Sequence, residues 1–132
     1  MPHDAAFTAL GSERFVSLTT FRRSGQPVST PVWVALEGDA LVVTTPAESG
    51  KVKRLRNNPR VEIRPCSRTG RVDDGAPSVA GVAQVLTGDD DRARLTSLIR
   101  AKYGLEYRLI MGLERLSRSG RRPRVLLRIT PA

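Results

Sequence analysis

The sequence predicts a mainly β fold with a few short helices (α+β), arranged as a small β-barrel. About six short segments are rich in residues that favour strands, and tight, glycine-containing turns separate the first three of them. A length of 132 residues suits one compact domain with its own core. Because no repeat, low-complexity tract or linker divides the chain, we expect a single domain over residues 1–132.

The chain starts with a predicted helix, followed by a predicted strand. Residues 4–10 are expected to form a short helix, since Asp4 can cap its start and Gly11 can end it. Residues 15–21 (FVSLTTF) mix apolar and hydroxyl side chains and include several residues that favour strands. This segment is therefore predicted to be the first strand.

Two further strands are expected to complete an antiparallel meander. Gly25 supplies the positive φ that a hairpin turn over residues 23–26 requires. The second strand is predicted over residues 28–36 (VSTPVWVAL), with Pro31 at an edge or a bulge because proline cannot donate to a strand ladder. The third strand is predicted over residues 40–45.

A helix is expected over residues 50–57. Ser49 can cap its first turn, and Asn58-Pro59 ends it because the residue before a proline avoids helical geometry. Val52 and Leu55 lie three positions apart and can face the sheet. The basic side chains of this helix are then left to project elsewhere.

The second half of the chain continues the same mixture of strands and helices. Three aspartates at positions 89–91 favour a helix start there, because they lie at the positive end of the helix dipole. The elements predicted in this half are strands over 61–66 and 79–86, a polar loop over 67–77, helices over 90–103 and 107–116, and a closing strand over 124–130.

The scarcity of histidine and cysteine excludes several kinds of site. With only His3 and Cys66, the chain offers too few ligands for a zinc site, and we expect no metal. A single cysteine excludes an internal disulfide. A Ser-His-Asp or Cys-His arrangement is not expected, because His3 lies in the N-terminal segment, which we expect to fray. No apolar run is long enough to span a membrane and no secretory signal is visible, so we expect a cytoplasmic protein that does not enter the membrane.

Positive charge is concentrated in particular parts of the sequence. The net charge is +9, and residues 51–71 alone hold eight basic groups against the single acid Glu62. Residues 72–91 carry five aspartates and no base, whereas residues 92–132 hold eleven bases and two acids. Codon usage can account for an excess of arginine, but the clustering in residues 51–71 indicates an anion site.

The stretch 44–61 (TTPAESGKVKRLRNNPRV) contains the most informative arrangement. It joins a strand end that carries two threonines to a helix whose first turn contains Gly50 and Lys51. Free backbone N–H groups and the helix dipole attract anions to such a start, and Lys51 with Arg54 would add full charges. A basic surface helix capped by serine would produce the same pattern, so both interpretations remain open.

The sequence resembles the pyridoxamine 5′-phosphate oxidase-like superfamily, the flavin-binding split β-barrels. Within it, the chain looks most like the actinobacterial oxidoreductases that use the deazaflavin coenzyme F-420. The resemblance rests on FVSLTTFRRSGQPVSTPVWVALEGDALVVTT, the helix SGKVKRLRNNPRV, the triplet Lys102-Tyr103-Gly104 and the closing PRVLLRITP. It implies a homodimeric split β-barrel of the flavin-reductase type, with a cofactor groove between the subunits.

The resemblance also implies where the cofactor lies. Its ring would rest near Pro31, Val32 and Trp33, although a lone tryptophan on a strand is more often a core or dimer anchor. The further cofactor-binding residues that the resemblance implies are Thr44 and Thr45 near the ring, Ser49, Gly50, Lys51 and Arg54 at the phosphate, and, more weakly, Lys53, Arg56 and Asn57.

The implied activity is an F-420-dependent oxidoreductase that passes a hydride to a conjugated, electron-poor small molecule such as a quinone, an enone or a biliverdin-like tetrapyrrole. No catalytic residue is indicated, because such chemistry belongs mainly to the cofactor. One alternative keeps the fold and replaces F-420 (8-hydroxy-5-deazaflavin) by FMN. A remote alternative is a nucleic-acid-binding β-barrel, which the positive charge permits but the aromatic content of 5% does not favour.

Overall fold

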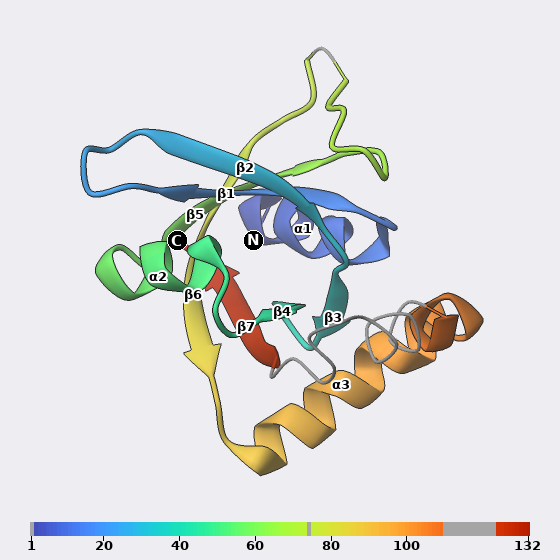
Figure 1. Cartoon of the computed structure of the whole chain (residues 1–132). Coiled ribbons are helices and arrows are strands. Elements are labelled where there is room, and N and C mark those ends of the chain that lie inside the picture. Colours follow the sequence, from blue (N-terminus) through green and yellow to red (C-terminus); the bar gives the residue numbers. More distant parts are fainter. Residues whose placement is uncertain (1, 74, 110–123) are drawn as a thin grey trace.

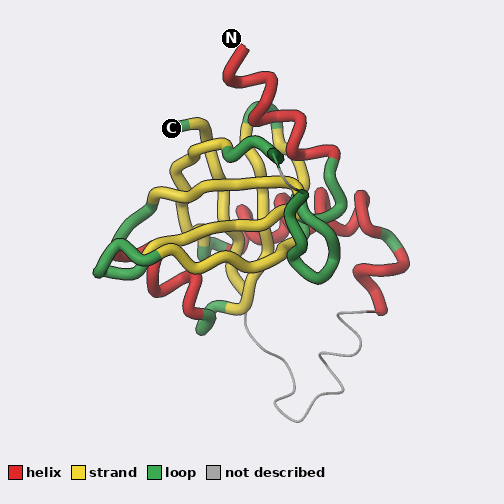
Figure 2. Tube along the Cα trace, turned by 90° about the horizontal axis from the view of Figure 1, so that it is seen from above, coloured by secondary structure: helices red, strands yellow, loops and turns green. Residues whose placement is uncertain are grey.

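A computed structural model of the chain describes residues 2–73, 75–109 and 124–132. The described residues form one antiparallel sheet of seven strands in the order β2-β1-β5-β6-β7-β4-β3, which rolls up into a barrel-like shape (Figures 1 and 2). The strands are β1 (Val16–Phe21), β2 (Pro27–Val32), β3 (Ala35–Glu37), β4 (Ala40–Pro46), β5 (Arg60–Pro65), β6 (Val79–Leu86) and β7 (Arg124–Pro131). The predicted mainly β fold with short helices is confirmed.

Three α-helices lie around the sheet in the described part of the chain. They are α1 (Pro2–Ala9), continued by a 3₁₀ turn over Leu10–Ser12, then α2 (Gly50–Asn57) and α3 (Asp89–Tyr103). Residues 105–109 are also helical, and the rest of the helix predicted over 107–116 lies outside the described residues. None of the described helices is long and apolar enough to cross a membrane.

The second predicted strand, 28–36, is in fact two strands, and the prediction of one continuous strand is wrong. β2 pairs with β1, whereas β3 pairs with β4 at the opposite end of the sheet. Trp33 and Val34 lie between them outside the ladder. This bend connects the two edges of the sheet and so makes the sheet curl. Pro31 lies on the edge strand β2, as its missing N–H requires.

Side chains from α3 satisfy the backbone at this bend. The Val34 N–H donates to the Tyr103 hydroxyl at 2.9 Å, and the Val34 carbonyl accepts from Lys102 Nζ at 2.6 Å. Lys102 also donates to the carbonyls of Gly11, at 2.7 Å, and Glu13. Buried polar backbone groups need partners, so Lys102 and Tyr103 supply what the interrupted ladder does not.

The apolar side chains divide into two clusters, one inside the barrel and one under α3. The interior cluster includes Phe7, Leu18, Ile63 and Ile129. The second cluster joins one face of the sheet to α3, and its members are Ala35, Val42, Leu95, Ile99, Tyr103 and Leu126. Val52 and Leu55 of α2 are buried, as their spacing predicts.

Gly81 of β6 lies where the barrel interior has no room for a side chain. A Cβ at this position would lie 2.8 Å from Ile129 Cγ2 and 3.3 Å from Phe7 Cε2. We expect Gly81→Ala to lower the free energy of unfolding by about 1–3 kcal/mol, because overpacking strains a dense core. Urea unfolding measures this loss. Gly88→Ala, where the nearest atom would be Asp91 Oδ2 at 3.7 Å, is the control, and an equal loss in both variants would contradict the explanation.

Candidate anion-binding site

The turn from β4 into α2 brings hydroxyl groups to the start of the helix. Ser49 occupies the N-cap position, but its side chain does not bond a helix amide and instead lies 3.3 Å from Thr45 Oγ1. The amides of the first helical turn, from Gly50 onward, have no acceptor within the helix. The expected capping by the Ser49 side chain is therefore absent, and the backbone N–H groups of the first turn are left without that partner.

Lys51 and Arg54 form the centre of a cationic cluster. Lys51 is half-buried, and the pKa of its ammonium is lowered by burial and by the nearby Arg54 and Arg124. Burial, and then Arg22, lower the pKa of Arg54. Among the residues that the structure describes, no carboxylate forms an ion pair with Lys51 or Arg54. Lys51 and Arg54 thus bring two positive charges together with no carboxylate partner in the part of the chain that the structure describes.

Arg54 is held in place by its neighbours. Its Nε donates to the buried Thr20 hydroxyl of β1 at 2.6 Å. Its guanidinium also lies against Gly50, where a Cβ would come within 2.7 Å of Nη1. Glycine at position 50 therefore leaves the space that the guanidinium fills, and the β1 hydroxyl fixes its direction.

Arg124 also belongs to this cluster, although no local feature of the sequence predicts it. Its Nε donates to Thr44 Oγ1 at 3.1 Å and its Nη2 donates to the Thr44 carbonyl at 3.3 Å. The residue reaches α2 because β7 pairs with β4, which places Arg124 opposite Pro46. Only the strand order, which the sequence pattern does not contain, could have identified it.

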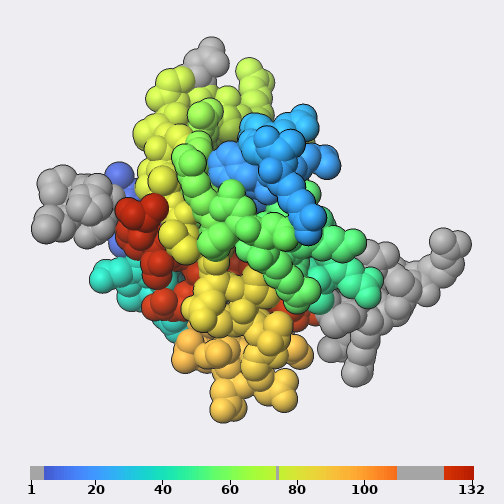
Figure 3. All heavy atoms as spheres, turned by 90° about the vertical axis from the view of Figure 1, so that its left-hand side faces the viewer, coloured from blue at the N-terminus to red at the C-terminus, as the bar shows by residue number. Residues whose placement is uncertain are grey.

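Three of the predicted phosphate residues, Lys53, Arg56 and Asn57, are exposed and lie outside the cluster. Lys53 and Asn57 are exposed on α2, where the Asn57 amide donates to the Lys53 carbonyl at 3.3 Å. Asn57 also accepts from Arg23 at 3.4 Å, which links α2 to the β1–β2 turn. Figure 3 shows this turn (blue) beside α2 (green) on one face of the molecule.

Of the residues predicted near the ring, Pro31, Val32 and Trp33 lie at the other end of β2. Thr44 and Thr45 instead lie with the cationic cluster, where Thr44 bonds Arg124 and Thr45 is 3.3 Å from Ser49. Val28 pairs with Thr20, the partner of Arg54, whereas Trp33 lies five residues further, about 16 Å along an extended strand. Pro31 is exposed, Val32 is buried, and Trp33 is half-buried and stacked on Tyr103 with ring centroids 4.6 Å apart. The predicted residues thus form two groups, one cationic and one aromatic and apolar.

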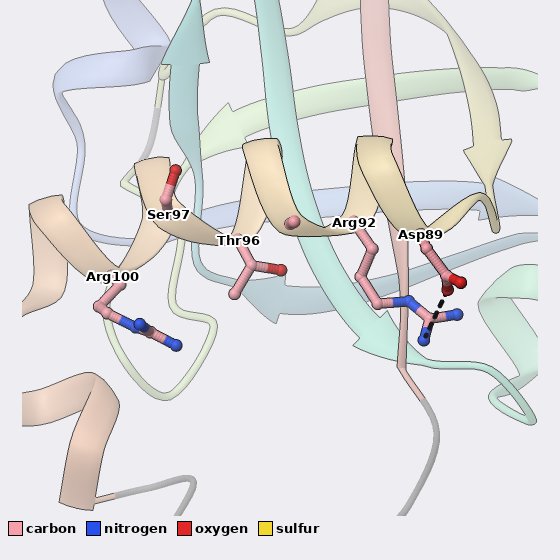
Figure 4. A pocket seen from close by; sticks show the side chains of 6 residues that line it. Asp89, Arg92, Thr96, Ser97 and Arg100 are labelled. Carbon is pink, nitrogen blue, oxygen red and sulfur yellow. Dashed lines mark ion pairs between the residues drawn. The ribbon is translucent and has the colours of Figure 1, made fainter.

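A hollow on the outer face of α3 is separate from both groups. The residues that line it are Asp89, Arg92, Ala93, Thr96, Ser97 and Arg100, as Figure 4 shows. Arg92 is 3.9 Å from Asp89, so part of its charge is already balanced.

Within residues 2–73, 75–109 and 124–132, no group of three or more histidine, cysteine or acidic side chains could hold a metal ion.

The arrangement fits an elongated ligand that has an anionic group at one end and a planar ring at the other. The cationic group can neutralise a phosphate, since charge-assisted bonds to lysine and arginine are short and strong. The aromatic group offers Trp33 as a surface for a ring. Neither group contains a histidine or a carboxylate suited to acid–base catalysis.

The lowered pKa of Lys51 predicts that its charge destabilises the folded chain. Both the folded and the unfolded chain carry this charge at pH 7, so the cost of burying it is fully present there. We expect Lys51→Met to raise the free energy of unfolding by about 0.5–1 kcal/mol at pH 7. The gain should shrink as the pH rises toward 10.5, the ordinary lysine value, because the folded chain loses this proton first. Urea unfolding at several pH values measures it.

Lys53→Met is the matched control, because Lys53 is exposed on the same helix. A stabilisation of equal size in both variants would show that burial at position 51 is not its cause.

Comparison with known proteins places this fold. Solved structures that share it include an F-420 reductase at 20% identity, covering 96% of this chain and 93% of that chain, with a TM-score of 0.60. An FAD-binding protein from Mesorhizobium loti is 17% identical, and the alignment covers 99% of this chain and 87% of that chain, with a TM-score of 0.67. The heme storage protein HutZ from Vibrio cholerae is 17% identical, and the alignment covers 99% of this chain and 89% of that chain, with a TM-score of 0.68. At these identities the likeness shows the fold alone.

No curated protein sequence matches the chain. The pyridoxamine 5′-phosphate oxidase family, in contrast, matches residues 2–132. The match contains the β1–β2 hairpin, the basic helix α2 and the closing strand β7, which are the segments on which the sequence resemblance rests. Over nearly its whole length, therefore, the chain belongs to the pyridoxamine 5′-phosphate oxidase family.

Proposed function

We propose that this chain is an oxidoreductase that binds coenzyme F-420 and reduces a conjugated, electron-poor small molecule. The observation that carries the proposal is the half-buried Lys51, which lies beside Arg54 and Arg124 and has no acidic partner among the described residues. Burying the Lys51 ammonium next to Arg54, with no described carboxylate beside it, is costly. A bound phosphate diester would offset that cost.

Lys51 and Arg54 would hold the phosphate of the cofactor. Arg54 reaches it in the direction set by Thr20, and the free amides at the start of α2 would add neutral hydrogen bonds. Arg124 would contribute charge from β7, while Ser49 and the β4 hydroxyls of Thr44 and Thr45 would contribute polar contacts. Lys53 and Asn57 are weaker candidates, since they lie on the exposed side of α2.

Pro31, Val32 and Trp33 would orient the ring at the far end of β2. The bound deazaflavin would supply the hydride, and the chain would supply position, exclusion of water and an electrostatic setting. The absence of a histidine or carboxylate in either group agrees with this division of roles. As in the sequence resemblance, we propose that a second copy of the chain completes the groove, giving a homodimer with a small-molecule substrate.

FMN is the principal alternative, because the same cations can bind its phosphate. We favour F-420 because its oligoglutamate tail would use more of the chain's positive charge. A nucleic-acid partner receives less support. The rings of Phe15 and Phe21 each have an arginine guanidinium within 6 Å of their centroids. They therefore do not combine with Trp33 into a row of open rings on which successive bases could stack.

A titration of the dialysed chain tests the function. Oxidised F-420 and, in parallel, FMN are added while fluorescence and absorbance are followed. We expect saturable binding of F-420 with an affinity at least tenfold higher than that for FMN. A preference for FMN would transfer the chain to the flavin-dependent branch, and binding of neither cofactor would overturn the proposed function.

The cationic cluster gives a prediction at the level of single residues. Lys51→Ala and Arg54→Ala should each weaken cofactor binding by about 1.5–3 kcal/mol, the usual cost of losing a charge-assisted hydrogen bond. Lys53→Ala, on the exposed side of the same helix, should change binding much less. Isothermal titration at one salt concentration measures all three, and a double variant that binds like the wild type would exclude these residues from the site.

The pKa of Lys51 predicts how cofactor affinity depends on pH. Because burial, Arg54 and Arg124 lower this pKa, the ammonium loses its proton at a pH below 10.5. Affinity should therefore fall as the pH rises through this lowered value, since a neutral amine attracts phosphate weakly. Lys51→Arg keeps its charge over the whole range. Its affinity should stay level relative to the wild type, and parallel pH profiles would count against the role of Lys51.

A further inference from the structure

We infer that Tyr103 is a positioning residue that fixes the ring end of the site through Trp33 and the Val34 backbone. This inference rests on the proposed function, because it assigns a role within the same cofactor site. Tyr103 belongs to α3 and lies about 70 positions from Trp33 in the sequence, yet it contacts two consecutive residues of the bend between β2 and β3.

The hydroxyl of Tyr103 controls the backbone at the bend. It accepts the Val34 N–H at 2.9 Å and lies within hydrogen-bond distance of the carbonyls of Arg14, at 2.7 Å, and Val34, at 2.9 Å. Val34 lies outside the strand ladder, so these contacts, with that of Lys102, replace the pairing that a strand would provide. Without the hydroxyl, the buried Val34 N–H has no other hydrogen-bond partner among residues 2–73, 75–109 and 124–132.

The ring of Tyr103 controls the neighbouring side chain. It stacks on the indole of Trp33 with an interplanar angle of 13°. One residue thus holds the side chain of Trp33 by its ring and the next peptide group by its hydroxyl. Tyr107, four residues further along the chain, contacts the same indole, with ring centroids 6.2 Å apart and an interplanar angle of 35°. Unlike the Tyr103 hydroxyl, its hydroxyl bonds no described residue.

The two ends of the site are held independently. Lys51 and Arg54 depend on α2, Thr20 and β7, and none of the contacts described for them involves α3. With the ends separated by about 16 Å along β2, changes at one end should not alter binding at the other. A ligand that lacks the phosphate therefore reports on the ring end alone.

The test compares two probes, F-420 and its ribityl-deazaflavin core without the phosphate, on Tyr103→Phe, Lys51→Ala and Tyr107→Phe. Tyr103→Phe keeps the stacked ring and removes the hydroxyl. We expect it to weaken the binding of both probes by the same factor, about five- to tenfold. Lys51→Ala should weaken the binding of F-420 and leave that of the ribityl core unchanged, and Tyr107→Phe should change neither. A folded Tyr103→Phe variant that binds both probes like the wild type would overturn the inference.

Two further measurements keep the test decisive. Trp33 is the only tryptophan, so the long-wavelength edge of the near-UV circular dichroism spectrum, beyond the tyrosine bands, reports its position. This band should change in Tyr103→Phe but not in Tyr107→Phe. If Tyr103→Phe does not fold, Trp33→Leu replaces it. That variant keeps the hydrogen bond between the Val34 N–H and the Tyr103 hydroxyl. It should weaken the binding of both probes equally, and unchanged affinity would again refute the inference. Failure of the wild type to bind either probe counts against the proposed function instead.

Discussion

The fold depends on a bend of two residues whose backbone is held by another part of the chain. β2 and β3 are consecutive in sequence but lie at opposite edges of the sheet, so the connection between them sets the curvature of all seven described strands. Such a bend exposes peptide groups that a straight strand would pair. Lys102 and Tyr103 take up those groups, and they bring α3 against the outer face of the barrel in doing so. The same contacts therefore close the barrel, hold α3 against it and position Trp33.

Local patterns in the sequence were sufficient for most elements but not for this bend. The strand that ends at Leu86 and the helix over α2 were predicted with the observed bounds, because spacing, turn residues and caps are local signals. Residues 28–36 contain mainly residues that favour strands, and nothing within them marks a break. The break is made by side chains that come from 68 and 69 positions away. A local reading of the sequence cannot contain that information.

The candidate site shows the same limit. Lys51 and Arg54 could be predicted because a basic helix start is a local feature, and the structure places them together. Arg124 could not, since it reaches them only through the pairing of β4 with β7. The positive surplus also proves to be partly structural. Arg94 and Arg128 both pair with Glu37, while Arg14 and Arg68 both pair with Glu106. Net charge alone therefore overstates how many cations are available to a ligand.

The prolines of β2 have a consequence for how chains meet one another. Pro27 and Pro31 lie on the outermost strand, four positions apart, and neither has an N–H. A strand from a neighbouring molecule would find two missing donors along this edge and could not continue the ladder. The edge is thereby protected against the sheet-to-sheet growth that leads to aggregation. It can remain accessible along its length, as a groove for a small molecule requires, without becoming a template for other chains.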